Sequence, residues 1–167
     1  MQDIILKRRS IRKYTEEPVS EETIRLLLEA GMSAPSAGDE RPWHFIALTD
    51  KAVKEQLPKH HPYASMTPQA PPVIVVCADL KQERYPGYWP QDCAAATQNI
   101  LLSAETQELG AVWLGVQPNT PRSKGLAALF GIPEGIEIFS LIAVGRPAET
   151  KESPSRYDAG RVHRDRW

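Results

Sequence analysis

Several features that would place a protein in a special class are scarce or missing in this sequence. Its 167 residues contain two cysteines, Cys77 and Cys93, both in apolar surroundings, so a disulfide framework is excluded and reduced thiols are expected. No run reaches the roughly eighteen apolar residues of a membrane span, and Met1 to Ser10 lacks the apolar core of a signal peptide. We therefore expect a cytoplasmic protein with no membrane part.

An excess of charge of either sign is also missing. Lysine and arginine together number 20 and aspartate and glutamate 21, which gives a formal net charge of -1 and a pI near 6.4. Bulk charge therefore supplies no attraction to nucleic acid, and we expect no nucleic-acid partner. The 41% hydrophobic and 25% charged residues are typical of a globular protein, and the length predicts a single domain spanning residues 1–167.

Against this neutral background, arginines are concentrated near the N-terminus. Arg8, Arg9, Ser10 and Arg12 fall within five residues, and apolar residues on both sides anchor the segment. Guanidinium groups keep their charge and present planar sets of donors that match phosphate oxygens. The cluster therefore favours a site for a small phosphate-bearing ligand. A solvated basic face or a weak nucleic-acid patch is the alternative that these residues alone leave open.

Hydrophobic periodicity predicts both helices and strands. The apolar run Val73–Ala78 is typical of a strand buried on both faces, so helices are expected on both sides of the sheet. The stretch Cys93–Ala104 carries no charge and predicts a helix packed in the core or against a second copy. Ser20, Thr49 and Thr120 are the expected N-caps. The expected helices are 4–9, 20–32, 50–57, 91–110 and 120–130, and the expected strands are 43–48, 73–78, 111–116 and 136–144.

Two stretches indicate a close approach of the backbone to a ligand. Residues 34–43 are mostly small and bounded by prolines, which suits a flat molecule, although composition alone favours a plain turn. Gly115, inside a predicted strand, indicates a bulge or a close approach. The adjacent His60 and His61 point apart and have no second ligand cluster nearby, so no metal site is expected. Beyond residue 147 the chain is too polar to pack alone, and is either loose or an arm that docks elsewhere.

Taken together in their order, four stretches resemble the nitroreductase family of FMN-dependent oxidoreductases. They are the arginine motif Arg8–Tyr14, the loop Ala34–Gly38 followed by Pro42-Trp43, the helix Asp92–Leu102 with Gln98-Asn99, and the strand Leu109–Val116. The closing Gly145–Glu149 and the tail rich in Arg, His and Trp are also similar. The resemblance implies an α+β fold with a mixed β-sheet flanked by helices, built as an intertwined homodimer with FMN at the subunit interface. Residues 146–167 would form a C-terminal arm that packs on the partner subunit.

The resemblance also assigns roles to individual residues. Arg8, Ser10 and Arg12 would hold the FMN phosphate, helped by Arg9 and by Arg156 in the tail. The partner subunit would contribute the loop that lines the isoalloxazine ring, and a strand end would approach the ring near its reactive N5. The loop residues are Pro35, Ser36 and Ala37, and the strand residues are Leu114 and Gly115.

The sequence departs from the family pattern in this loop, where Asp39 and Arg41 replace the usual Asn and Gln. An amide both donates and accepts, whereas a carboxylate only accepts and a guanidinium only donates. Asp39 would accept from the flavin N3–H while Arg41 stabilises charge near O2. The alternative is that the two residues simply pair at the surface, where such pairs contribute little.

The function implied by the resemblance is hydride transfer from NADH or NADPH to flavin N5, followed by reduction of a nitroaromatic, quinone or similar planar acceptor. The cofactor carries this chemistry, so no nucleophile or acid–base dyad is required, and the sequence contains no motif for one. The nicotinamide preference and the acceptor stay open. A catalytically idle module that binds FMN for storage or redox sensing is the alternative function.

Overall fold

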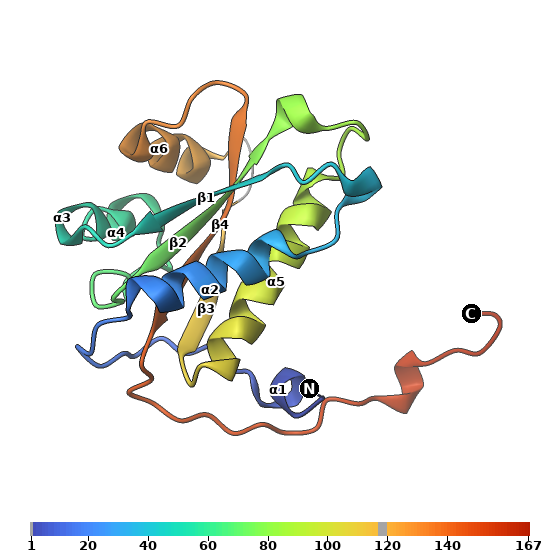
Figure 1. Cartoon of the computed structure of the whole chain (residues 1–167). Helices are drawn as coiled ribbons and strands as arrows, with labels where there is room; N and C mark the ends of the chain where they lie inside the picture. The colour runs from blue at the N-terminus through green and yellow to red at the C-terminus, as the bar shows by residue number, and fades with distance from the viewer. Residues whose placement is uncertain (1, 117–119) are drawn as a thin grey trace.

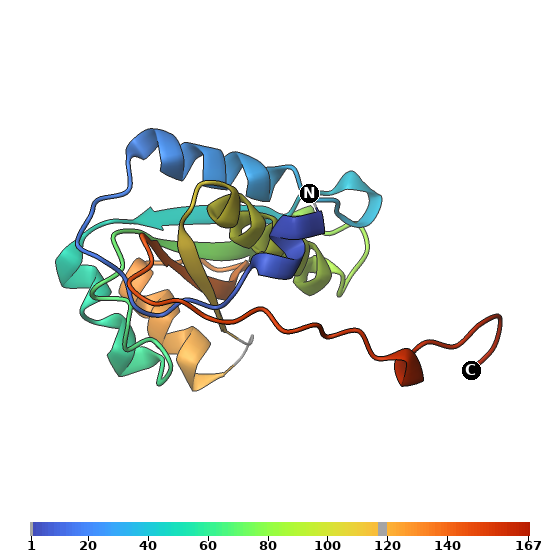
Figure 2. The same ribbon diagram turned by 90° about the horizontal axis from the view of Figure 1, so that it is seen from below.

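The computed structural model describes residues 2–116 and 120–167, which form one sheet covered by helices on both faces (Figures 1 and 2). The four strands lie in the order β1-β2-β4-β3, and each neighbouring pair is antiparallel. They are β1 (Trp43–Leu48), β2 (Val73–Asp79), β3 (Gly110–Gly115) and β4 (Ile136–Gly145). The strands predicted from periodicity are thus confirmed to within a residue or two at their ends.

The α+β class is confirmed, but the expected mixture of strand directions is wrong for these four strands. The parallel pairing among the described residues is the isolated bridge between Ser10 and Ala111, at the free edge of β3. Continuous apolar runs are typical of parallel strands because helices usually cover both faces of parallel sheets. Here helices cover both faces of an antiparallel sheet, so the strands are equally apolar and the sequence does not reveal their direction.

Six α-helices and three short 3-10 helices surround the sheet in the described residues. Helices α2 and α5 cover one face, and α3, α4 and α6 lie on the other (Figures 1 and 2). The α-helices are α1 (Gln2–Lys7), α2 (Glu21–Met32), α3 (Lys51–Lys54), α4 (Leu57–His60), α5 (Trp89–Thr106) and α6 (Pro121–Phe130), and the 3-10 helices are η1 (Ala37–Asp39), η2 (Leu80–Gln82) and η3 (Ala159–Arg161). None of the helices in 2–116 and 120–167 is long and apolar enough to cross a membrane.

Local sequence signals explain where most helices begin. The Ser20 hydroxyl accepts a hydrogen bond from the Thr23 N–H, and the Thr120 hydroxyl accepts one from the Ser123 N–H, so both predicted caps are confirmed. The predicted cap at Thr49 is wrong, because Asp50 accepts from the Val53 N–H at 3.0 Å instead. The single helix expected over 50–57 is also wrong: α3 ends at Lys54, and a second short helix, α4, follows from Leu57.

Strand β2 joins the two halves of the core. Its side chains alternate between the faces of the sheet, and residues 73–78 are all buried, as predicted for a central strand. Val73, Val75 and Cys77 belong to the cluster under α4 and α6, whereas Ile74, Val76 and Ala78 belong to the cluster under α2 and α5.

Helix α5 fills the centre of one face. Cys93, Ala96 and Ile100 are fully buried against the sheet, and Gly31 of α2 lies so close that an added Cβ would meet Ile100 at 3.0 Å. The opposite side of α5 is half-buried, including Ala95 and Leu102. The uncharged stretch Cys93–Ala104 therefore packs in the core of its own chain and still presents a partly apolar face outside it.

The C-terminal arm, residues 146–167, leaves the body of the molecule (Figure 1). It first runs beside the N-terminal segment, and then every residue from Lys151 onward is exposed. The exposed residues include Tyr157 and Trp167, and the Trp167 ring stacks on His163 with 4.3 Å between ring centroids. Packing of this arm on a partner subunit stays a prediction.

Candidate functional site

The arginine motif is held in place by two neighbouring segments. On one side, the Ile11 N–H donates to the carbonyl of Ala111, at the edge of β3. On the other side, backbone hydrogen bonds from Thr15 to Arg146 and from Ala148 to Lys13 tie it to the start of the C-terminal arm. The motif is therefore part of the folded body.

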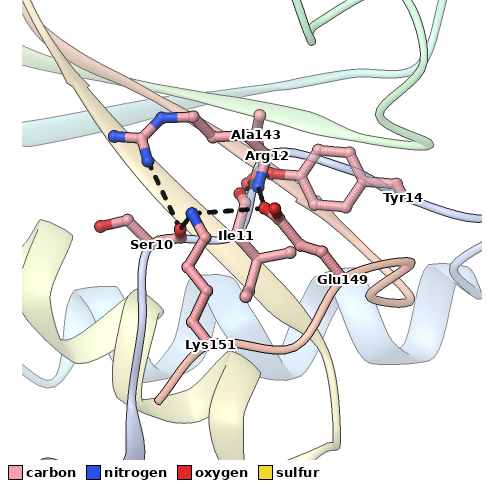
Figure 3. A network of polar contacts seen from close by, with 7 residues as sticks. All are labelled: Ser10, Ile11, Arg12, Tyr14, Ala143, Glu149 and Lys151. Carbon is pink, nitrogen blue, oxygen red and sulfur yellow. Dashed lines mark hydrogen bonds and ion pairs between the residues drawn. The ribbon is translucent and has the colours of Figure 1, made fainter. Parts of the chain in front are cut away.

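Side chains of the arm fasten this segment further (Figure 3). The Glu149 carboxylate accepts from the Arg12 backbone N–H at 2.6 Å, and this bond is the main reason that the pKa of Glu149 is lowered. The Lys151 ammonium donates to the Ser10 carbonyl at 2.6 Å and lies 3.4 Å from Glu149. Neither Glu149 nor Lys151 was a predicted site residue, because contacts between the two ends of a chain leave no local sequence signal.

A buried tyrosine fixes the turn that follows Arg12. The Tyr14 hydroxyl donates to a carbonyl oxygen, and those of Ile11 at 2.6 Å and Ala143 at 3.0 Å both lie within reach (Figure 3). Burial strongly raises the pKa of Tyr14, so this hydroxyl keeps its proton. The Arg12 backbone is thereby held near β4 as well as by Glu149, and its guanidinium makes one long contact, 3.5 Å to the Ser10 carbonyl (Figure 3).

Three of the predicted arginines gather at one cavity of about 480 Å³, beside Leu6. Burial lowers the pKa of the Arg8 guanidinium, and the charges of Arg9 and Arg156 lower it further. Arg9 bonds to the protein itself, donating to the carbonyls of Arg8 and Glu152 and contacting the Ser153 hydroxyl. Among the described residues, the guanidinium groups of Arg8 and Arg156 have no hydrogen-bond or ion-pair partner, so these two arginines are the ones available to an anion.

Arg12 faces a different cavity, of about 590 Å³, which also contains Leu114 and Gly115. The predicted phosphate residues are therefore divided between two hollows within one chain. Gly115 is exposed there, and a Cβ added to it would meet no atom within 4 Å, so a side chain would project into open space. The absence of a side chain leaves the end of β3 accessible, and a close approach of a flat ligand there stays a prediction.

Two residues that the sequence did not single out for this cavity hold the carbonyl of Gly115. His61, which is only 1% exposed, places its Nε2 at 3.0 Å from this oxygen, and Arg122 donates to it at 2.8 Å. The Arg122 guanidinium also lies over the ring of Tyr63, 5.9 Å from the centroid. Burial is the main cause that lowers the pKa of His61. Residues between α4 and β2 complete this wall of the cavity: Pro62, Tyr63, Ser65 and Met66.

The loop that contains Pro35, Ser36 and Ala37 lies elsewhere, at the start of α5. The Ala37 N–H donates to Asp92 at 2.9 Å, and the Ser36 hydroxyl accepts from the Arg41 N–H at 3.0 Å. None of the described residues 35–41 lines either of the two arginine cavities. Within one chain the predicted ring contacts are thus not brought together.

Two buried carboxylates support this loop. Glu40 accepts from the N–H groups of Arg84 and Tyr85, and burial is the main cause that raises the pKa of Asp92, with the nearby Glu40 and Glu83 adding to it. One oxygen of Asp92 and one of Glu40 are buried without a hydrogen-bond partner among the described residues. The start of α5 therefore holds more negative charge than its surroundings neutralise.

Asp39 and Arg41 form a bidentate ion pair, with N–O distances of 2.6 and 2.7 Å. Both side chains are largely exposed, and each pKa is shifted in the direction expected for a partner of opposite charge. Both residues also have positive φ values, of 56° and 48°. This is the arrangement foreseen in the surface-pair alternative, and a contact with flavin stays a prediction.

Comparison with known proteins places these features in a family. The model of the nitroreductase family matches residues 5–61 and 54–146. A provisionally named NADH dehydrogenase/NAD(P)H nitroreductase of Methanothermobacter thermautotrophicus is 47% identical over 165 residues, which cover 99% of this chain and 86% of the relative. A Thermus thermophilus protein named NADH dehydrogenase is 31% identical, over an alignment that covers 94% of this chain and 91% of the relative.

Solved structures agree with the sequence comparison. An FMN-dependent nitroreductase from Clostridium difficile has a TM-score of 0.92 at 27% identity, with both chains fully covered. A provisionally named nitroreductase from Desulfovibrio desulfuricans, solved in complex with FMN, has a TM-score of 0.86 at 33% identity and covers 99% of this chain and 96% of that one.

Proposed function

Because the chain belongs to the nitroreductase family, we propose that it is an FMN-dependent oxidoreductase driven by NADH or NADPH. When bound, FMN supplies the hydride chemistry at its N5 and passes electrons to a nitroaromatic, quinone or similar planar acceptor. The chain's own residues then have three tasks, which are to bind the phosphate, to orient the ring and to set the charge around it.

The concentration of positive charge near Leu6 is the observation that carries the proposal. Arg9 and Arg156 repel the Arg8 guanidinium, Glu105 offsets this only in part, and no carboxylate among the described residues lines the cavity that the three arginines share. A phosphate would neutralise this repulsion and accept hydrogen bonds from Arg8. Ser10, whose hydroxyl makes no hydrogen bond among the described residues, is the fourth phosphate ligand that we assign, and Arg12 is the fifth.

The accessible end of β3 suits the ring of the same cofactor. Gly115 offers a backbone without a side chain, Leu114 adds an apolar contact, and the cavity of about 590 Å³ is in the usual range for small-molecule sites. We assign these two residues to the neighbourhood of flavin N5. Pro35, Ser36 and Ala37 would cover the ring from a second chain, since in their own chain they lie away from this cavity.

A homodimer follows from the same geometry. Leu6 is 67% exposed on α1, Tyr157 and Trp167 are exposed on the arm, and α5 presents a half-buried apolar side. A second copy would cover these surfaces, and burial of apolar area is the main driving force of such association. Arm residues 146–167 would then pack on the partner subunit.

Steady-state oxidation of NADH and NADPH, with menadione or nitrofurazone as acceptor, tests this function. We expect a yellow protein whose turnover depends on FMN and on the acceptor. A protein that binds FMN but oxidises neither nucleotide would instead be a storage or sensing module. A colourless protein whose apo form does not take up FMN would contradict both functions.

A further inference from the structure

The buried ring of His61 has a defined hydrogen-bond partner at each nitrogen. Nε2 lies 3.0 Å from the Gly115 carbonyl, and Nδ1 accepts from the Tyr63 N–H at 3.2 Å. A carbonyl can only accept and a backbone amide can only donate, so Nε2 carries a hydrogen and Nδ1 does not. The two contacts together specify the neutral imidazole in a single tautomer.

The peptide group that His61 contacts is restrained on its other side as well. The Val116 N–H donates to the Phe139 carbonyl at 2.9 Å, and Arg122 donates to the same Gly115 oxygen at 2.8 Å. The position of Gly115 therefore depends on β4, on α6 and on His61. Only the His61 contact can be switched by a proton at ordinary pH, because arginine stays charged.

A second proton on His61 would break this arrangement. It would occupy Nδ1, so the Tyr63 N–H would lose its acceptor and face another N–H group. The imidazolium charge would also lie beside Arg122, in a buried position that shares its cavity with Arg12. The neighbouring His60 packs toward Gly125 of α6, and no Asp or Glu lines this cavity among the described residues, so nothing there compensates the added charge.

We propose that neutral His61 is a positioning residue, a latch that ties the loop of residues 62–66 to the Gly115 carbonyl and shapes the cavity beside the flavin ring. Protonation of the ring opens the latch. The link to flavin rests on the proposed function, whereas the latch itself is a property of the protein without cofactor. Pro62, Tyr63, Ser65 and Met66 line the cavity, so release of this loop changes the surface that a planar molecule meets.

The sign of the pH effect follows from the direction of the His61 shift. Its pKa is lowered in the folded protein, so on acidification the unfolded chain takes up the proton first. Folding stability should then fall as the pH drops below about 6.5, the ordinary histidine value, and should level off below the folded pKa. The ordinary histidine value of about 6.5 is the reference for this titration.

Two-dimensional ¹⁵N NMR of the imidazoles in the apoprotein tests the latch directly. We expect His61 to show the Nε2–H tautomer and to titrate below about pH 6.5, the ordinary histidine value. An Nδ1–H tautomer, or a His61 titration at or above about pH 6.5, would overturn the proposal. This readout needs no FMN, so a failure of the latch and a failure of the proposed function give different results.

Variants then test the consequence for the cavity. His61→Phe removes both hydrogen bonds, and we expect FMN to bind about tenfold more weakly, the equivalent of one or two lost hydrogen bonds. His61→Gln keeps a donor and an acceptor, so it should recover part of that affinity and lose the acid-dependent fall in thermal stability. His44→Gln, at an exposed position on β1, is the matched control and should retain both properties of the parent. A His61→Gln protein with the parent's acid-dependent profile would refute the latch, and if His61→Phe fails to fold, the tautomer measurement still decides.

Discussion

Replacing Asp92 separates the two tasks of this residue, which are to accept a hydrogen bond and to carry a charge. Its Oδ1 accepts from the Ala37 N–H at 2.9 Å, and the nearby Glu40 helps to raise its pKa, at the loop that we assign to the flavin ring. Asp92→Asn keeps an acceptor for Ala37 and adds a donor for Glu40. Asp92→Ala leaves the Ala37 N–H without a partner, which costs about 1–3 kcal/mol when the group is buried.

The structure predicts that the contribution of this position to stability depends on pH in the parent and not in the asparagine variant. The pKa of Asp92 is raised above its usual 3.8, mainly by burial, so the folded parent holds this proton more tightly than the unfolded chain. Its contribution to stability is complete below about pH 3.8 and is lost as the pH rises through the folded pKa. Asp92→Asn carries no titrating group, so it should become more stable than the parent toward about pH 8.

Denaturant unfolding of the apoproteins at several pH values measures both effects. For a chain of this size, the loss in Asp92→Ala corresponds to a fall in Tm of about 2–12 °C. Glu55→Gln, which removes an exposed charge at the end of α3, is the control and should follow the parent at every pH. If Asp92→Asn were destabilised as much as Asp92→Ala across the whole range, the argument from buried charge would be refuted.

Three further predictions concern the cofactor and the assembly. Arg12→Ala should weaken FMN binding by about 1.5–3 kcal/mol, the scale of a hydrogen bond to a charged group. Titration of the apoprotein with FMN measures this loss, and the neighbouring Lys13→Ala should leave the affinity for FMN unchanged. Arg41→Gln should lower the flavin midpoint potential and Asp39→Asn should raise it, because positive charge favours the reduced anion; spectroelectrochemistry that gives identical potentials would show that the pair lies only on the surface. Light scattering should give about twice the 18.6 kDa of one chain, and deletion of residues 151–167 should weaken the dimer; a folded full-length monomer near 18.6 kDa would contradict it.

Sequence reasoning succeeded where the structural cause is local. Ser20 and Thr120 cap their helices because a hydroxyl reaches an N–H three residues ahead, and the run Val73–Ala78 is apolar because both of its faces are covered. It failed at Thr49 and Asp50, because either side chain can cap a helix. The structure shows that Asp50, which has the longer side chain, caps α3.

The site was predicted less completely because its geometry depends on distant contacts. Arg8 and Arg12 are four residues apart, yet they face different cavities, since the segment between them pairs with β3 and with the arm. His61 reaches Gly115 across a separation of 54 residues, and neither position carries a motif that would link them. The sequence therefore predicts that the arginine motif can bind an anion. The residues that orient its side chains can be identified only from the folded structure.

Reduction and reoxidation of the bound cofactor is the most direct test of the central claim. Under anaerobic conditions, one equivalent of NADH or NADPH should bleach the visible absorbance of the FMN-loaded protein, and menadione or a nitroaromatic should restore it. Each half-reaction should be fast enough to account for steady-state turnover. An FMN-loaded protein that neither nucleotide bleaches, or whose reduced flavin no planar acceptor reoxidises, would contradict the proposed oxidoreductase function.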